Sequence, residues 1–333
     1  MKRLLVTGGT GSFGNSLVER ELQQDWDEIR IFSRDEKKQY EARKKFSNDN
    51  VSFYIGDVRD SVSTDNAMQG ITHIFHAAAL KQVPTCEFFP DQAIKTNILG
   101  TQNIIASAKK FGAKRFVLLS TDKAAYPINA MGVSKAMAEK IALAEAFNSH
   151  DNDLVINITR YGNVMGSRGS VIPLFYDQLK ARQELTITNP KMTRFMMSLS
   201  DSVDLVKYAM SKGKPGELFI NKAPAASVHI IAEAMSELLD IDYKEKIIGV
   251  RGGEKLYETL ITQEEMARAK DEGPYFRIMA DPNYLGYSAF FDVGTSIDRQ
   301  TQEFNSDNAE PISKESLISW FSKLGFVEGK FHE

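Results

Sequence analysis

The chain has 333 residues, of which 42% are hydrophobic, and it contains one cysteine, Cys86. A chain of this size can bury one large core, or a large and a small one, and a single cysteine excludes an internal disulfide and suits a reducing compartment. The formal net charge of −3 provides no electrostatic footprint for nucleic acid or for an anionic membrane, so neither partner is expected.

No apolar run approaches the ~20 residues that span a bilayer. The apolar run at residues 4–6, near the N-terminus, is too short for the core of a signal peptide. We therefore expect a cytoplasmic protein.

The first half of the chain alternates short apolar runs with longer helical patterns. Helical patterns cover residues 12–24, 91–110 and 131–148, and the expected strands are residues 3–7, 28–32, 51–55, 72–76, 115–119 and 154–159. This alternation indicates right-handed βαβ crossovers and a parallel sheet covered on both faces. We predict an α/β fold with a Rossmann-type, doubly wound parallel sheet, in which residues 1–160 form the first domain.

After Arg160 the pattern changes to glycine-containing loops, short helices and isolated strands such as residues 217–220. Near the end, four apolar residues share one helical face that Gly325 ends: Leu317, Trp320, Phe321 and Leu324. We expect residues 161–333 to form mainly a smaller α/β substrate-binding domain with C-terminal helices, and some of these later segments to return to the first domain.

A glycine-rich loop follows the first expected strand and opens a helix. Gly8 permits a tight turn, Gly11 lets the backbone approach a pyrophosphate, and Gly14 lets helix and strand pack closely. The N–H groups at the start of the helix then face the phosphate charge. This setting favours dinucleotide binding over a merely structural turn, with contacts expected from Thr7, Gly8, Thr10, Gly11, Ser12, Phe13 and Gly14.

The end of the second expected strand bears on the choice of dinucleotide. NAD usually requires an acid there for its ribose 2′-hydroxyl, whereas the 2′-phosphate of NADP requires a cation. Ser33 stands where the acid would be, Arg34 can grip a phosphate bidentately, and Lys37 follows. A solvated helix start with Asp35 as N-cap is the alternative. We predict that residues 1–160 form an NADP-binding domain, with NAD as the less favoured cofactor, and that no metal is bound.

Two further segments follow expected strands. Asp57, after the third expected strand, has a carboxylate that can accept a hydrogen bond from the adenine amino group. An ordinary turn aspartate is the alternative. Three alanines after the fourth strand would let the cofactor lie on the backbone, although an alanine-rich helix start explains them almost as well. His76, before them, is expected to be a packed strand-end residue. The candidate cofactor contacts are Asp57, Val58, Ala77, Ala78 and Ala79.

Residues 120–135 follow the fifth expected strand and contain the candidate catalytic residues. Asp122 lies beside Lys123, and Lys135 stands at the start of a helical pattern. Adjacent acid and base groups at the carboxyl end of a buried strand, near a nucleotide-binding loop, indicate proton shuttling on a bound substrate. An Asp–Lys surface ion pair is the alternative.

With these residues placed, the chain resembles the extended short-chain dehydrogenase/reductase superfamily over nearly its whole length. More narrowly, it resembles the inverting UDP-N-acetylglucosamine 4,6-dehydratases of bacterial capsule and flagellin-sugar biosynthesis. The Thr-Asp-Lys triplet at 121–123, where other sugar dehydratases have Thr-Asp-Glu, is the specific discriminator. The matching segments are residues 7–14, 33–35, 56–60, 77–84, 120–135, 160–164, 166–170, 192–195 and 251–255.

This resemblance implies a lyase with a closed redox cycle on UDP-N-acetylglucosamine. Hydride leaves C4 for the cofactor, the C5 proton and the C6 hydroxyl leave as water, and the hydride returns to C6. Reprotonation of C5 from the opposite face gives UDP-2-acetamido-2,6-dideoxy-beta-L-arabino-hex-4-ulose. The resemblance also implies a homo-oligomer, a hexamer.

The resemblance assigns roles within residues 120–135. Lys123 is the C5 base, and it must be held neutral by burial and nearby positive charge, because an ordinary lysine is protonated at neutral pH. Asp122 donates a proton to the departing C6 hydroxyl and must stay protonated, so the two groups titrate as a coupled pair. Thr121 orients the 4-hydroxyl, and Lys135 binds the nicotinamide ribose.

Met131 departs from the family's Tyr-x-x-x-Lys pattern. Residues 131 and 135 share a helix face, but a thioether cannot take the C4 hydroxyl proton. Lys123, a water relay or Tyr126 could serve instead. We interpret Met131 as the sign of a variant mechanism, with an inactive NADP-binding regulator as the alternative.

The resemblance places the substrate contacts mainly in the second half. Asn163 and the 168–170 loop would hold the sugar and uracil, two arginines would hold the diphosphate with guanidinium forks, and Glu254 would bind a uridine ribose hydroxyl. A local salt bridge is the alternative for each charged group. The candidates are Lys81, Asn163, Arg168, Ser170, Thr193, Arg194, Arg251 and Glu254. The enzymatic alternative to the dehydratase is a UDP-hexose or UDP-N-acetylglucosamine 4-epimerase, which shares the fold but eliminates nothing.

Overall fold

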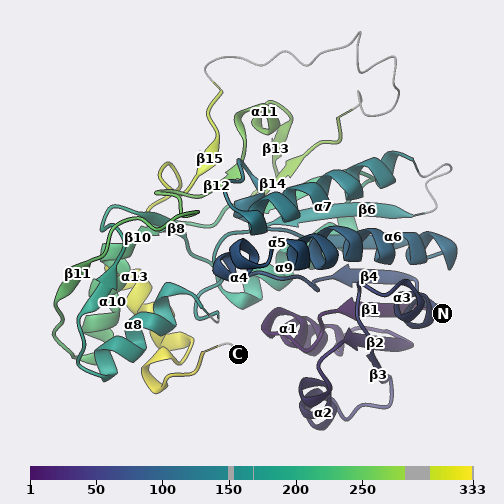
Figure 1. The fold of residues 1–333 in the computed structure, drawn as a ribbon, viewed down its shortest axis with the longest axis horizontal. Helices are drawn as coiled ribbons and strands as arrows, with labels where there is room; N and C mark the ends of the chain where they lie inside the picture. Colours follow the sequence, from purple (N-terminus) through teal and green to yellow (C-terminus); the bar gives the residue numbers. More distant parts are fainter. Residues whose placement is uncertain (149–153, 168, 282–300, 332–333) are drawn as a thin grey trace.

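The computed structural model describes all residues except 149–153, 168, 282–300 and 332–333 (Figure 1). Within this part, the largest sheet has nine strands in the order β13-β14-β9-β6-β5-β4-β1-β2-β3. The strands from β9 to β3 pair in parallel, and β14 and β13 extend the sheet antiparallel. Their bounds are β1 (Arg3–Thr7), β2 (Glu28–Ser33), β3 (Val51–Ile55), β4 (His73–His76), β5 (Arg115–Leu119), β6 (Val155–Arg160), β9 (Leu218–Asn221), β13 (Ala269–Asp271) and β14 (Tyr275–Ile278).

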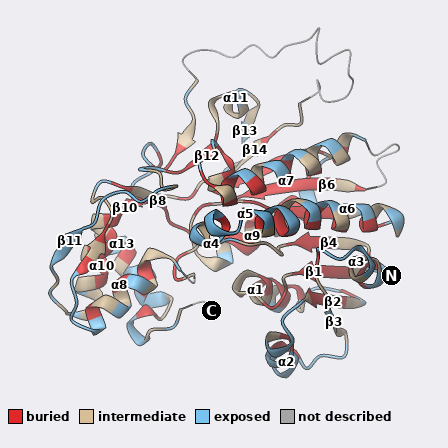
Figure 2. Cartoon of the chain, in the orientation of Figure 1, coloured by how far each residue is buried: buried red, intermediate tan, exposed pale blue. Residues whose placement is uncertain are grey.

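The central strands are buried on both faces (Figure 2). Along β5, Phe116 and Leu118 belong to one core cluster, whereas Val117 and Leu119 belong to the other, because successive side chains of a strand point to opposite faces. Helices α3 (Ser61–Met68), α6 (Gly100–Lys110) and α7 (Ala130–Phe147) supply the first cluster. Helices α1 (Ser12–Glu21), α2 (Glu36–Lys45) and α9 (Leu199–Lys212) supply the second. The predicted Rossmann-type doubly wound sheet is confirmed.

The helix expected over residues 91–110 is interrupted. Helix α5 (Pro90–Ala93) passes into a π-helix, η1 (Ile94–Leu99), before α6 begins. Within η1, the Asn97 side chain bonds both the N–H and the C=O of Leu80, at 2.8 and 3.0 Å, and donates to Ser134. The widened turn therefore coincides with a side chain that satisfies the backbone of the 77–84 segment.

A second lobe has its own core cluster. Helices α8 (Val171–Lys180), α10 (Val228–Leu239) and α13 (Lys314–Lys323) supply it together with residues of two of three short sheets. These sheets pair β8 (Thr193–Phe195) with β10 (Ala225–Ser227), β7 (Leu185–Ile187) with β11 (Glu245–Ile247), and β12 (Thr259–Ile261) with β15 (Phe304–Asn305). Strands β7 and β10 contribute to this cluster, whereas β12 contributes to the first cluster. The other short elements are α4 (Val83–Phe88), η2 (Asp122–Ala124), α11 (Gln263–Met266) and η5 (Phe326–Glu328).

The ends of the expected elements agree with the structure to within a few residues. Strands β4, β6 and β9 each begin one residue later than expected. In α13, Leu317 and Phe321 are fully buried, and Gly325 follows with a φ of +75°. Although they follow residue 160, β9, β13 and β14 lie in the large sheet. The division of the chain at residue 160 stays a prediction.

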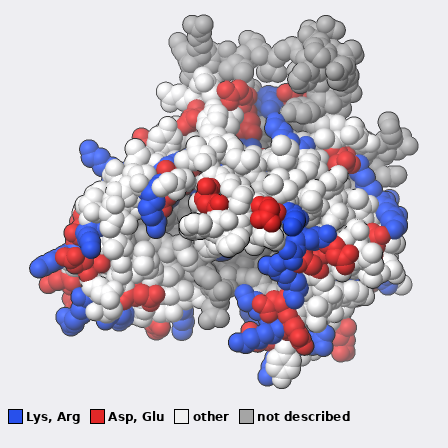
Figure 3. Space-filling view, viewed as in Figure 1, with Lys and Arg blue, Asp and Glu red and all other residues white. Residues whose placement is uncertain are grey.

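Charged side chains of both signs are mixed on the face shown in Figure 3. In the part of the chain that the structure describes, no helix combines the length and apolar character needed to cross a membrane.

Candidate active site

A cavity of about 1700 Å³ opens at the carboxyl ends of the parallel strands, where open α/β sheets bind ligands. Gly8 after β1, Ser33 at the end of β2 and Ala77 after β4 line it on the sheet side. Thr186 and Val228 line it from the second lobe. The cavity therefore lies between the two parts of the molecule.

The loop after β1 is shaped by its glycines. Gly8 has a φ of +67°, and a Cβ there would lie 2.9 Å from the backbone nitrogen of Ala78. A Cβ on Gly14 would lie 2.5 Å from the carbonyl oxygen of Gly8. Side chains at these positions would push the loop away from β4 and α1, so glycine allows the tight turn and the close helix packing.

The N-terminus of α1 faces the cavity. Its N-cap is Gly11, which offers no side chain to the first-turn N–H groups. The lining residues here are Thr10, Gly11, Ser12, Phe13 and Gly14. A helix N-terminus without a side-chain cap suits an anionic group, so the loop fits the pyrophosphate of a dinucleotide.

Arg34 and Ser33 lie at the cavity edge beyond β2. The Ser33 hydroxyl is 2.7 Å from that of Thr10. The Arg34 side chain is 55% exposed, and its Nη1 lies 3.6 Å from Oδ2 of Asp57. Burial raises the pKa of Asp57, but hydrogen bonds from Arg59 and the charge of Arg34 outweigh this effect and lower it. The Asp57 carboxylate is thus engaged by arginine, and Val58 beside it also lines the cavity.

Lys37 does not line the cavity. Its exposed side chain is 4.0 Å from Glu41, and Lys38 lines the cavity instead. The Asp35 side chain accepts a hydrogen bond from the Lys38 N–H at 3.0 Å, so Asp35 is the N-cap of α2, and the role of Arg34 beside it stays a prediction.

The segment after β4 brings Ala77, Ala78 and Ala79 to the cavity wall. Thr7 is fully buried and does not line it, because its hydroxyl lies 2.7 Å from Nδ1 of His76 and accepts from the Ala78 N–H at 3.2 Å. Burial and the charge of Lys135 lower the pKa of His76 to about 3. His76 is therefore a packed, neutral residue, as predicted.

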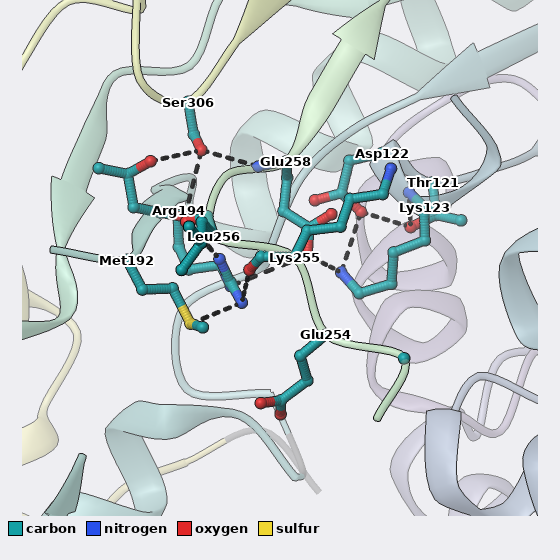
Figure 4. Close-up of polar contacts among 12 residues, drawn as sticks. Thr121, Asp122, Lys123, Met192, Arg194, Glu254, Lys255, Leu256, Glu258 and Ser306 are labelled. Carbon is teal, nitrogen blue, oxygen red and sulfur yellow. Dashed lines mark hydrogen bonds and ion pairs between the residues drawn. The ribbon is translucent and has the colours of Figure 1, made fainter. Parts of the chain in front are cut away.

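Asp122 and Lys123 lie together in the cavity (Figure 4). Asp122 is 1% exposed, and its Oδ1 accepts from Lys123 Nζ at 3.1 Å and from the Thr121 hydroxyl at 2.7 Å. The hydroxyl of Thr121 also caps the short helix η2. The acid and the base predicted from the sequence thus share a hydrogen bond away from bulk solvent, which argues against a surface ion pair.

A third ionisable group, Glu258, joins this pair, and it is not among the residues expected from the sequence. Its Oε1 lies 3.4 Å from Lys123 Nζ and 3.8 Å from Arg194 Nε, and the residue is 3% exposed. Glu258 immediately precedes β12, about 135 residues after the Asp122–Lys123 pair. An isolated glutamate before a short apolar run carries no local signal for this position.

These neighbours decide the charge of Lys123. Burial lowers the pKa of Lys123, but the charges of Asp122 and Glu258 outweigh burial and raise it above the ordinary value. The prediction of a neutral amine is therefore not met by this arrangement, which favours the ammonium form. The amine can act as a base only after a proton has moved to a neighbouring group.

Lys135 and Met131 occupy the same face of α7, as predicted. The Nζ of Lys135 donates to the carbonyl oxygen of Leu119 at 2.5 Å, and burial lowers its pKa to about 8. Met131 is 4% exposed, lines the cavity, and packs in a cluster with Cys86 and Ala93. No proton-accepting group stands at position 131.

Tyr126 is directed away from the cavity. Its hydroxyl donates to Glu264 at 3.0 Å and accepts from the N–H of Gln263 at 3.1 Å, and the residue is 41% exposed. It is not among the lining residues. Tyr126 is therefore removed as a candidate for the C4 base, which leaves Lys123 or a water relay.

Two of the predicted substrate residues present buried polar atoms. Oδ1 of Asn163 and Oγ of Ser170 have no hydrogen-bond partner among the described residues, and both residues line the cavity with Lys81. Buried polar atoms are normally paired, so these two suit a ligand. Arg168 lies outside the described residues.

The predicted phosphate-binding residues are partly engaged within the protein. Arg251 Nε donates to Oε1 of Glu254 at 2.9 Å, which is the salt bridge held open as the alternative, and both residues line the cavity. Figure 4 shows the Glu254 carboxylate directed away from Lys123. Arg194 lines the cavity, whereas Thr193 does not and lies 2.8 Å from the hydroxyl of Ser306.

The described residues contain no group of three or more His, Cys, Asp or Glu side chains placed to hold a metal ion.

Comparison with known proteins identifies a family whose sequences match most of the chain. Residues 4–280 match the family described as polysaccharide biosynthesis protein. A UDP-glucose 4-epimerase of Rickettsia felis is 49% identical over 331 residues, which cover 98% of this chain and 97% of that protein.

Two solved structures place the fold. Pen from Bacillus thuringiensis is 36% identical with a TM-score of 0.87, and the match covers 97% of this chain and 98% of that one. DesIV, a dTDP-glucose 4,6-dehydratase from Streptomyces venezuelae solved with NAD and TYD bound, is 23% identical with a TM-score of 0.70. That match covers 76% of this chain and 86% of DesIV, and it shows a shared fold.

Proposed function

Since the chain belongs to the polysaccharide biosynthesis protein family, we propose that it is a UDP-N-acetylglucosamine 4,6-dehydratase that inverts C5. The observation that carries this proposal is the buried Asp122–Lys123 pair, joined at 3.1 Å inside the cavity. Elimination of water needs a base for the C5 proton and an acid for the C6 hydroxyl, and a pair of this kind supplies both. The Thr-Asp-Lys resemblance supports the same assignment.

The loop after β1, the three alanines after β4 and Lys135 would hold a nicotinamide dinucleotide. This cofactor supplies the group that accepts hydride from the sugar and returns it. Arg34 favours NADP, because its half-exposed guanidinium lines the cavity beside Ser33, which stands at the strand end where NAD-binding proteins usually have an acid. Lys135 would donate to the nicotinamide ribose from the floor of the cavity.

The protein's own groups divide the proton transfers. Lys123 would remove the C5 proton once its amine is neutral, and Asp122 would protonate the departing C6 hydroxyl. The 3.1 Å contact between them lets a proton pass from amine to carboxylate and reset both groups. Asn163 and Ser170 would bind the sugar with their buried polar atoms, which have no partner among the described residues, and Arg194 and Arg251 are candidates for the diphosphate.

A second candidate function is UDP-glucose 4-epimerase. It is favoured by the name of the Rickettsia felis relative, which is 49% identical over nearly the whole chain. An epimerase also oxidises C4, but it returns the hydride to C4 and keeps the C6 hydroxyl. The two candidates therefore differ in the composition of the product.

Mass spectrometry of the product decides between them. The purified protein is incubated with UDP-N-acetylglucosamine or UDP-glucose, with NADP or NAD added in parallel. The dehydratase loses one water from the amino sugar, and in heavy water it incorporates deuterium at C5. A product of unchanged mass would reject the dehydratase, and a product with only protium at C5 would reject proton removal there.

A further inference from the structure

Glu258 is a buried carboxylate to which the proposed steps give no role. Its Oε1 faces Lys123 Nζ at 3.4 Å, while its Oε2 is buried without a hydrogen-bond partner among the described residues. Burying a carboxylate oxygen unpaired costs about 1–3 kcal/mol or more. Glu258 also lines the cavity. A costly buried charge at this place calls for a function.

The position of Glu258 is held by its backbone. Its N–H donates to the Ser306 hydroxyl at 3.0 Å, and the Ser306 N–H donates back to its carbonyl oxygen at 2.8 Å. The Ser306 hydroxyl also lies 2.8 Å from that of Thr193. Two chain segments therefore fix the carboxylate beside the amine of Lys123.

The reaction produces more protons than Lys123 can hold. Oxidation of the C4 hydroxyl releases a hydride and a proton, and removal of the C5 proton follows. One amine has one lone pair and cannot keep both protons. Met131 offers no basic atom, and Tyr126 is engaged with Glu264 outside the cavity. Asp122, 3.1 Å from Lys123 Nζ, already holds the proton that it gives to the C6 hydroxyl, so a second acceptor must contact Lys123.

We propose that Glu258 is this second acceptor. It acts through Lys123, from whose amine it takes a proton, and is therefore a positioning residue. Lys123 enters this step as a neutral amine, after its ammonium has passed one proton to Asp122, which thereby becomes the acid for the C6 hydroxyl. As the C4 hydroxyl O–H bond breaks, its proton bonds to Lys123 Nζ, and an Nζ proton passes to the Glu258 carboxylate. The electron pair of the C4–H bond leaves as hydride to the cofactor, so a ketone, a neutral amine and a carboxylic acid result. The neutral amine can then take the C5 proton. This inference rests on the proposed function through its C4 oxidation, a step that an epimerase shares.

The charges around Glu258 suit an acceptor. Burial raises its pKa, Lys123 lowers it, Asp122 raises it, and Arg194 and Lys255 lower it, with a raised pKa as the result. These groups face it from η2, from β8 and from the segment that precedes β12. A carboxylate with a raised pKa holds a transferred proton better than an exposed one.

The test uses the holoenzyme with Glu258→Gln, which keeps the shape but cannot take a proton. Rapid mixing with UDP-N-acetylglucosamine follows the appearance of reduced nicotinamide, which reports C4 oxidation alone. We expect a rate about 100-fold lower, in the range of general acid–base effects, with substrate affinity by calorimetry unchanged. The wild-type rate should fall as pH decreases through the pKa of Glu258, and this acid limb should be absent from the variant.

Two further variants separate proton transfer from structure. Glu258→Asp retains a carboxylate and should recover part of the rate and the acid limb. Glu303→Gln is the matched control, because the Glu303 carboxylate accepts from Asn305 at 2.7 Å instead of contacting Lys123. It should leave the rate of C4 oxidation unchanged.

A readout independent of turnover is the pKa of Lys123, measured by NMR with labelled lysine in the wild type and in Glu258→Gln. Loss of the adjacent charge should lower it. An unchanged oxidation rate, or an acid limb that persists in Glu258→Gln, would overturn the inference. A wild-type product of unchanged mass would instead reject the dehydratase, while the C4 oxidation rates would still decide the role of Glu258.

Discussion

Lys135 donates a hydrogen bond of 2.5 Å from its Nζ to the carbonyl oxygen of Leu119. This contact ties α7 to the end of β5, where the Thr-Asp-Lys triplet begins. A second contact acts beside it: a Cβ on Gly132 would collide with the carbonyl oxygen of Lys123. Helix α7 and the reactive loop are therefore packed backbone to backbone, and changes in either one should alter the position of the other.

Replacing Lys135 by methionine should change the pH dependence of stability. Burial lowers the pKa of Lys135 from 10.5 to about 8, so the unfolded chain binds more protons than the folded one between these values. The contribution of Lys135 to stability therefore rises from pH 8 to pH 10.5, by on the order of 3 kcal/mol. Denaturant unfolding should show that the wild type gains stability relative to Lys135→Met as the pH rises over this window. A pH-independent difference would contradict the assigned pKa.

Replacing Lys123 by methionine should reduce turnover about 10³-fold, because no amine remains to take the C5 proton. Deuterium incorporation at C5 in heavy water should fall with it. The exposed Lys95, paired with Asp91 at 3.7 Å, gives the matched control Lys95→Met, which should keep full turnover. If C5 of the sugar still exchanged at the wild-type rate in Lys123→Met, Lys123 would not be the base.

Replacing Met131 by tyrosine should not restore a lost activity. Met131 is 4% exposed and packed against Cys86 and Ala93, so the larger ring should destabilise the fold by about 1–3 kcal/mol. Met131→Leu conserves volume and should cost less than about 1.5 kcal/mol. Turnover and thermal unfolding measure both effects. A large gain in turnover with tyrosine would show that the natural site is impaired.

Replacing Arg34 by alanine should weaken NADP binding without a matching loss for NAD. A hydrogen bond to a charged group contributes about 1.5–3 kcal/mol, which corresponds to roughly a 10- to 150-fold higher Kd for NADP. Fluorescence titration of both dinucleotides measures the ratio. An equal loss for NAD and NADP would mean that Arg34 stabilises the fold around Asp57 instead of reading the 2′-phosphate.

Replacing Arg160 by methionine should destabilise the fold by about 3–5 kcal/mol. Arg160 is buried between the carboxylates of Glu139 and Glu265, with contacts of 2.6 Å to each. Without the guanidinium, the buried Glu139 carboxylate would face the partly buried carboxylate of Glu265, which keeps its bond from the Thr262 N–H at 3.0 Å. Denaturant unfolding measures the loss, and it should be smaller in the double variant Arg160→Met with Glu139→Gln. A loss below about 1 kcal/mol would contradict a structural role for this ion pair.

Local features of the fold were predictable from the sequence. The strands that build the parallel sheet are short apolar runs, and the loop at Gly8 follows β1 with the spacing that the turn requires. Asp35 could be identified as an N-cap because a cap bonds an N–H only three residues away. Asp122 and Lys123 could be paired because they are adjacent. Each of these features depends on interactions over a few residues.

The tertiary structure alone decided which distant groups meet. Glu258 reaches Lys123 because β12 pairs with β15 and Ser306 holds its backbone, and no pattern near residue 258 encodes that encounter. Tyr126 and Glu264 are likewise far apart in the chain, and their hydrogen bond turns the phenol away from the cavity. The protonation of Lys123 follows from such encounters, because charge and burial at a site sum over whatever the fold brings there. The amino-acid order determined the sheet, the glycine loop and the adjacent acid and base, whereas long-range packing determined the electrostatics under which they act.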